Sequence, residues 1–133
     1  MTRQSVVRRA VAGIGLMLAL VVSAQEPIDN CASLLGSLSV ELRYARNLSP
    51  SARTTFVCPR DTKALLGASK QRIVKSLGPP DVTATAEHDG GSATWSYFFG
   101  PKPDSSYPPG VPELRFEFDG QQKVTTVSCQ RTR

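Results

Sequence analysis

Apolar residues recur at helical spacing in residues 29–46. The stripe consists of Cys31, Leu34, Leu35, Leu38, Leu42 and Ala45. Successive members are one, three or four positions apart and fall on one face of a helix. We therefore expect a helix that begins near Asp29 or Asn30, either of which is a suitable cap. Residues 40–44 also alternate, so a strand at the end of the segment stays open.

A second, shorter helix is predicted within residues 65–81, which read LLGASKQRIVKSLGPPD. Its apolar stripe consists of Ile73, Val74 and Leu77. Ser69 is placed to cap the first turn, Gly78 to end the helix, and Pro79-Pro80 cannot continue it. A helix of about eight residues does not persist alone in water, so it must pack on other elements.

Alternating apolar and polar residues predict three antiparallel strands after residue 92. They are Ala93–Phe99, Glu113–Asp119 and Lys123–Cys129. Asp119-Gly120 indicates a hairpin turn between the last two strands. Val124 and Val127 fall on opposite faces of a regular strand, which predicts a bulge near that turn. Residues 82–92 are polar and are expected to form a loop, with an irregular strand in the first half left open.

Two helices and three consecutive strands predict an α+β fold, a two-layer sandwich with both helices packed on a three-stranded antiparallel sheet. We expect the apolar side of the sheet to pack on the stripe of the second helix. That side consists of Trp95, Tyr97, Leu114, Phe116, Phe118 and Val127.

The connection between the first two strands, residues 100–112, contains five prolines. Prolines stiffen a loop and favour polyproline II, and long loops in small domains often carry function. A stiff connector that protects the sheet edges is the alternative. If the loop and the sheet form a partner surface, we expect it to consist of Tyr107, Pro108, Pro109, Trp95 and Arg115.

Residues 1–24 have the pattern of a secretory signal peptide. Its basic residues are Arg3, Arg8 and Arg9, and they precede a twelve-residue apolar run, Val11–Val22, that is too short to span a bilayer. Small residues before Ala24 predict cleavage that leaves Gln25 as the first residue. No cysteine stands at that site, so we expect no lipid anchor.

Removing this segment changes what the charge implies. The full chain carries +5, but without the three signal arginines 13 basic residues face 11 acidic ones, a net charge of +2. That balance does not favour nucleic-acid binding. Residues 25–133 then form one domain, with the first helix and a linker in 25–64 and the second helix with three strands in 65–133. We expect no transmembrane anchor in it.

Three cysteines remain in that domain, and an oxidising compartment favours one disulfide. We favour Cys58 with Cys129, because both follow strand-like segments, and Cys31 with Cys58 is the alternative. The third cysteine would be buried or would link to another chain. No Cys-x-x-Cys is present, the one histidine is His88, and no metal-ligand spacing is found.

Glu113 and Glu117 share a strand face with Arg115 between them, which favours a solvated charge ladder over a carboxylate pair. We therefore expect neither cofactor nor catalysis. A small thiol-dependent redox protein is the least favoured alternative.

Residues 65–128 resemble the SmpA/OmlA family, the BamE-like small outer-membrane lipoproteins. The resemblance rests on G-x-S-K-x-x-I-V-x-x-L-G-P-P-D at 67–81, W-S-Y at 95–97, F-E-F-D-G at 116–120 and V-x-x-V at 124–127. The order is also similar in outline to the repeat unit of beta-lactamase inhibitory protein. The resemblance implies two helices on a three-stranded sheet, and proteins that bind other proteins at the outer membrane without catalysing reactions.

The chain departs from this family where lipid modification would occur, since Ala24-Gln25 replaces the family's acylated cysteine. We therefore expect a periplasmic or secreted, non-catalytic module for protein binding or envelope assembly. Its partner would be another envelope or secreted protein. Inhibition of a periplasmic or secreted enzyme is the alternative.

Overall fold

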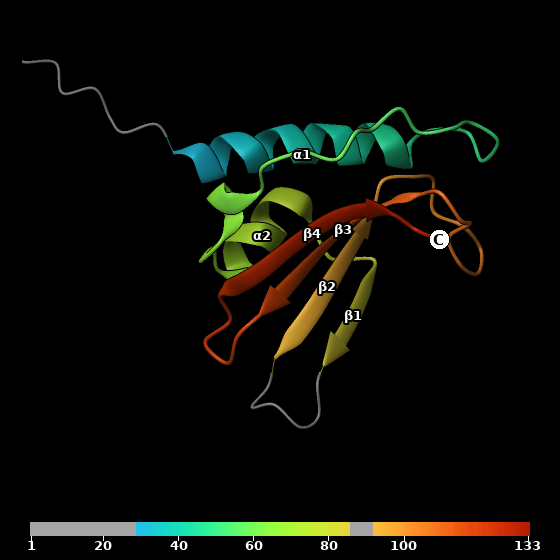
Figure 1. Ribbon diagram of the computed structural model, residues 1–133. Coiled ribbons are helices and arrows are strands. Elements are labelled where there is room, and N and C mark those ends of the chain that lie inside the picture. Colours follow the sequence, from blue (N-terminus) through green and yellow to red (C-terminus); the bar gives the residue numbers. More distant parts are fainter. Residues whose placement is uncertain (1–28, 86–91) are drawn as a thin grey trace, which may run out of the picture.

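The structure is a computed structural model that describes residues 29–85 and 92–133. The expected signal segment, its cleavage site at Ala24 and Gln25, and His88 lie outside the described residues. Within them, two α-helices and a four-stranded antiparallel sheet form two layers (Figure 1). The predicted α+β class is confirmed, whereas the predicted number of three strands is wrong.

The sheet has the order β1-β2-β3-β4, so each strand pairs with its neighbours in the sequence. The strands are β1 (Val82–Thr85), β2 (Ala93–Phe98), β3 (Pro112–Phe118) and β4 (Val124–Arg131). β1 is the additional strand, and it lies where we expected a loop with an irregular strand left open. All four of its residues are exposed. An edge strand with both faces in water has no reason to alternate, which explains why the sequence pattern did not identify it.

The register of β2, β3 and β4 separates an apolar face from a polar one. Tyr97 lies opposite Leu114, which in turn lies opposite Cys129, and all three therefore point to the same side of the sheet. Burial alternates along β3 as predicted, from Leu114 at 0% exposure to the exposed Arg115. The apolar face is the one that the helices cover.

A bulge interrupts the pairing of β3 with β4, as predicted. Glu117 pairs with Thr126 but Phe118 pairs with Val124, which leaves one extra residue on β4. This shift returns Val124 to the buried side, at 3% exposure. In the turn before it, the residue with positive φ (62°) is Gln122. The Asp119 carboxylate supports the turn by accepting hydrogen bonds from the backbone N–H groups of residues 121 and 123.

Helix α1 (Asn30–Arg46) confirms the longer helical prediction. Asp29 is its cap, with the carboxylate accepting a hydrogen bond from the Ala32 backbone N–H at 3.1 Å. Leu35, Leu38, Leu42 and Ala45 of the predicted stripe are buried, and Cys31 and Leu34 are partly buried against the same core. The strand alternative for residues 40–44 is wrong.

Helix α2 (Lys70–Leu77) is preceded by a short 3-10 turn, η1 (Lys63–Leu65). The Ser69 hydroxyl accepts a hydrogen bond from the Arg72 backbone N–H, and Gly78 ends the helix with φ of 78°, both as predicted. Ile73 and Leu77 are buried, but Val74 is 39% exposed. The predicted stripe is therefore one residue too wide, because this short helix turns a narrower face to the core.

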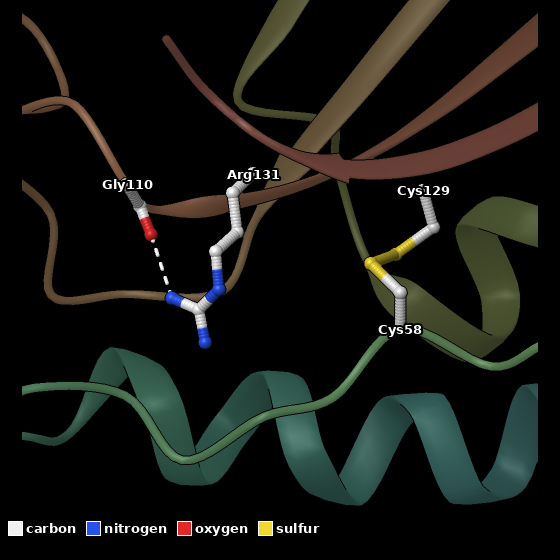
Figure 2. The surroundings of a disulfide bond; sticks show 4 residues. All are labelled: Cys58, Gly110, Cys129 and Arg131. Carbon is white, nitrogen blue, oxygen red and sulfur yellow. Dashed lines mark hydrogen bonds between the residues drawn. A yellow bond between two sulfur atoms is a disulfide. The ribbon is translucent and has the colours of Figure 1, made fainter.

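The disulfide joins Cys58 and Cys129, with 5.6 Å between the two Cα atoms (Figure 2). The favoured pairing is confirmed and the pairing of Cys31 with Cys58 is wrong. Cys31 keeps a free, partly buried thiol. Cys129 lies inside β4 rather than after it, and Cys58 lies in a segment without regular secondary structure. The bridge therefore fastens an irregular segment to an edge strand.

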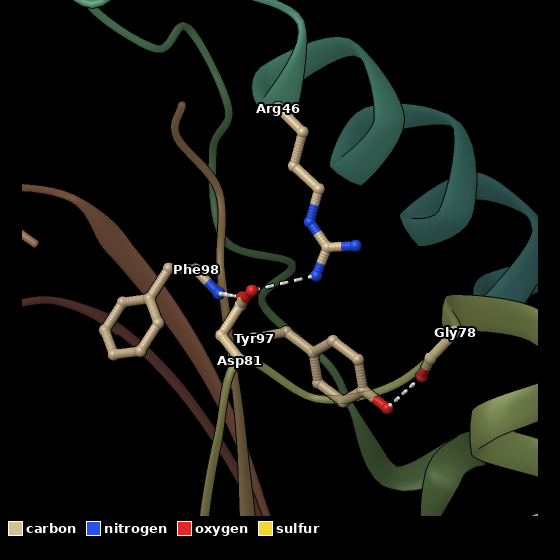
Figure 3. A network of polar contacts seen from close by, with 5 residues as sticks. All are labelled: Arg46, Gly78, Asp81, Tyr97 and Phe98. Carbon is tan, nitrogen blue, oxygen red and sulfur yellow. Dashed lines mark hydrogen bonds and ion pairs between the residues drawn. The ribbon is translucent and has the colours of Figure 1, made fainter. Parts of the chain in front are cut away.

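Asp81 joins α1 to the sheet (Figure 3). Its carboxylate accepts a hydrogen bond from the Arg46 guanidinium at 3.1 Å and another from the Phe98 backbone N–H at 2.8 Å. The Asp81 side chain is only 10% exposed. Nearby, the Tyr97 hydroxyl donates a hydrogen bond to the Gly78 carbonyl oxygen at 2.8 Å. These contacts link the ends of both helices to β2.

Stability is expected to fall as the pH rises above about 10. Burial, the chief cause, raises the pKa of Tyr97. An unfolded tyrosine loses its proton near pH 10 while the folded one keeps it, so the unfolded state is favoured increasingly above that pH. The loss has an upper limit of about 1.4 kcal/mol per pH unit for one tyrosine. Urea unfolding between pH 9 and 11 measures it. Tyr97→Phe should reduce the slope, and an unchanged slope would contradict the assignment.

Candidate functional site

The proline-rich loop, residues 99–111, lies across one end of the sheet and is fastened to the chain's last described residues. Gly110 N–H donates to the Thr132 carbonyl oxygen and Thr132 N–H donates to the Val111 carbonyl oxygen, both at 2.9 Å. The Arg131 guanidinium donates to the Gly110 carbonyl oxygen at 2.8 Å (Figure 2). The Thr132 hydroxyl also donates to the Pro108 carbonyl oxygen at 3.2 Å, so four hydrogen bonds hold the C-terminal end of the loop.

Tyr107 anchors the same loop instead of projecting from it. Its ring stacks on Phe98, with 4.2 Å between the ring centroids and 14° between the planes. Its hydroxyl oxygen is buried and has no hydrogen-bond partner among the described residues. Burial, followed by the neighbouring Asp81 carboxylate, raises the pKa of Tyr107. The expectation that Tyr107 is the exposed aromatic of a partner surface is therefore wrong in part, because one face and the hydroxyl are covered.

The structure separates the remaining predicted surface residues. Arg115 lies on the open face of the sheet, where its guanidinium donates to the Glu113 carboxylate at 3.1 Å. Trp95 lies on the opposite, helix-covered face, because it pairs with the buried Phe116 and its ring meets Phe118 edge-on. Trp95 and Arg115 therefore cannot belong to one continuous surface, which corrects the predicted set.

Pro108 and Pro109 are exposed, as a partner surface requires. Both prolines line a cleft that lies between the loop and residues 50–54. Its volume is about 630 Å³. A second cleft of about 420 Å³ lies on the other side of the loop and is lined in part by Asp81, Phe98 and Tyr107. Sequence reasoning identified the loop but not the segment that faces it.

The open face of the sheet is polar and no helix covers it (Figure 1). Across β2, β3 and β4 the register places on it Thr94, Ser96, Phe98, Glu113, Arg115, Glu117, Thr126, Ser128 and Gln130. Ser96 is buried there at 4% exposure, with its hydroxyl donating to the Glu113 carboxylate at 2.9 Å. The part of this face where β3 pairs with β4 is open, since the paired residues Glu117 and Thr126 are both exposed. We call these nine residues the open sheet face.

The described residues show no group of three or more His, Cys, Asp or Glu side chains that could hold a metal ion. Arg115 and Glu117 are exposed, as the expected solvated charge ladder requires, but the Glu113 side chain is only 15% exposed and is engaged by both Ser96 and Arg115. Cys31 is partly buried, and burial raises the pKa of its thiol, so little of the reactive thiolate forms at neutral pH. These side chains offer no arrangement of nucleophile and base.

Between residues 29 and 133, leaving out 86–91, no helix has the length and apolar character needed to cross a bilayer.

Comparisons with protein-family models, with curated proteins and with solved structures found no match for the chain.

Proposed function

We propose that the protein is an exported, non-catalytic module that binds another envelope or secreted protein. The observation that carries this proposal is the open sheet face. A two-layer domain with helices on one side only leaves the other side of its sheet available for contact. Export is supported by the signal-like residues 1–24 and by the Cys58–Cys129 disulfide, since disulfides persist in oxidising compartments.

The sheet also offers an edge for a partner strand. β1 is short, and all four of its residues are exposed, with no charged side chain among them. Such an edge exposes unpaired backbone N–H and C=O groups. An extended peptide can pair with these groups and add a new strand to the sheet. The opposite edge is partly occupied: Val124 exchanges backbone hydrogen bonds with Gly67 and Ala68. Binding at the sheet is therefore favoured at the open face and at β1.

The motif order in residues 67–127 supports placing this module with the BamE-like proteins, without their lipid anchor. That placement predicts a partner in the outer-membrane assembly machinery. The second candidate is inhibition of a periplasmic or secreted enzyme, which a proline-rich loop held by hydrogen bonds favours because preorganisation reduces the entropic cost of binding. The two candidates differ in the partner and share the absence of catalysis.

A crosslinked pull-down from the protein's own periplasm tests the proposal. Thr94→Lys with Thr126→Lys places a lysine on each side of Glu117, where cross-strand charge pairing favours folding. We expect this variant to lose its partner. Ser33→Lys with Ser37→Lys makes the same charge change at exposed positions of α1, and this control variant should still capture the partner.

Capture of outer-membrane assembly components would support the BamE-like role, and capture of one soluble enzyme would support inhibition. Equal capture by both variants would contradict the assignment to the open sheet face. Capture of no protein would contradict the binding module itself.

A further inference from the structure

The cleft between residues 50–54 and the proline-rich loop has a positive lining. Arg53, Lys102 and Arg131 all contribute to it, and its lining contains no aspartate or glutamate. Arg131 is oriented by its hydrogen bond to the Gly110 carbonyl oxygen. Arg53 and Lys102 make no ion pair and no side-chain hydrogen bond within the described part of the chain. Three cationic residues therefore line one concavity whose lining contains no acidic side chain, and Lys102 also lines the second cleft, where Asp81 and Glu113 lie.

Packing contacts and the disulfide hold the walls of the cleft in place. Phe56 and Phe99 stack with 3.8 Å between ring centroids; Phe99 precedes the lining residue Gly100, and Phe56 lies two positions after the lining residue Thr54. At Gly100 a Cβ atom would come within 3.2 Å of the Val111 side chain, so the loop packs closely on itself. The disulfide fixes Cys129, two residues before Arg131. A volume of about 630 Å³ lies in the range of ligand sites, about 300–1,000 Å³.

The lining also indicates which anion fits. Five of its residues are prolines, which have no backbone N–H to donate: Pro50, Pro101, Pro103, Pro108 and Pro109. Phosphate sites are commonly built from backbone N–H groups, and the Gly110 N–H is already used by Thr132. The charged donors of the lining are the side chains of Arg53, Lys102 and Arg131. The guanidinium group of arginine can donate two parallel hydrogen bonds to a carboxylate. Proline rings supply apolar contact for an extended chain.

We propose that this cleft binds an acidic peptide segment of the partner protein, with its carboxylates on Arg53, Lys102 and Arg131. The inference rests on the proposed protein-binding function and names the chemistry of the partner. The segment lies extended between the two loops, and its backbone and aliphatic stems contact the prolines and Val111.

Fluorescence anisotropy of the full disulfide-bonded protein with a labelled, N-acetylated tetraglutamate peptide tests the proposal. Arg53→Gln with Lys102→Gln should weaken binding at least about tenfold, a loss of about 1.4 kcal/mol. Arg60→Gln with Lys75→Gln removes the same charge from exposed positions outside the cleft and should change the affinity less than about twofold. A tetraglutamine peptide should not bind measurably.

Three results would overturn the proposal: equal losses in both double variants, equal binding of the two peptides, and full competition by inorganic phosphate at the concentration of the peptide. The pull-down distinguishes a failure of the cleft proposal from a failure of the proposed protein-binding function. A partner captured equally well by the Arg53→Gln, Lys102→Gln variant would leave the binding module in place and remove the cleft from its interface.

Discussion

Replacing both bridged cysteines by serine is expected to lower the free energy of unfolding by about 4 kcal/mol. The bridge joins residues separated by 71 positions, and a crosslink that closes so long a loop removes much of the entropy of the unfolded chain. It also fixes the irregular segment around Cys58 against β4. Urea unfolding of the Cys58→Ser, Cys129→Ser variant measures the loss, and reduction of the wild-type bridge should give a similar one.

Cys31→Ser is the matched control for this measurement. It removes the partly buried thiol of the remaining cysteine and leaves the bridge intact. We expect a loss below about 1 kcal/mol, as for most single substitutions outside the fully buried core. A loss in the control as large as that in the double variant would show that thiol packing, rather than the crosslink, carries the effect.

Asp81→Ala is expected to lower the free energy of unfolding by about 2–3 kcal/mol. The substitution removes two acceptor interactions at once, from the Arg46 guanidinium and from the Phe98 backbone N–H. The Asp81 side chain is 10% exposed and that of Arg46 is 30% exposed, so water replaces the lost bonds only in part. Denaturant unfolding measures the loss, and hydrogen exchange at the Phe98 amide should accelerate.

Two variants check that the effect belongs to this pair of contacts. Asp104→Ala removes a carboxylate from an exposed position of the nearby loop and should stay within about 0.5 kcal/mol of wild type. Arg46→Ala combined with Asp81→Ala should cost less than the sum of the single substitutions, because the residues contact each other. Additive losses would contradict a coupled pair.

Periodicity predicted the elements that turn one face to the core. The i, i+3, i+4 stripe of α1 and the alternation of β3 each reflect burial on one side, and both were identified with bounds close to the observed ones. Local chemistry identified the two ends of α2, since Ser69 caps its first turn and Gly78 ends it, each acting within a few residues of its own position. The bulge followed from the uneven phase of Val124 and Val127.

The features that sequence reasoning missed depend on contacts between distant residues. β1 has both faces exposed and therefore leaves no alternating pattern. Val74 follows Ile73 on the helix, and only the observed packing shows that α2 turns one of the two outward. Trp95 was expected both on the apolar side of the sheet and in the partner surface, and the register confirms only the first of these placements.

The candidate site was predicted only where one segment carries it. The four prolines of the loop are visible in the sequence, but Arg53 comes from a linker and Arg131 from the end of β4. No local pattern relates these residues, because the fold alone brings them to one cleft. Tyr107 was misjudged for the same reason: its ring is covered by Phe98, a residue nine positions away across a loop.

The order of the cysteines along the chain has a consequence for how the protein matures. Synthesis proceeds from the amino end, so Cys31 and Cys58 become available before Cys129, the 129th of 133 residues. During that interval the only intramolecular disulfide that can form is the non-native one between Cys31 and Cys58. Chains trapped in that state reach the native pairing only by thiol–disulfide exchange. Cys31 can therefore compete with Cys129 for Cys58 during maturation, although it takes no part in the finished bridge.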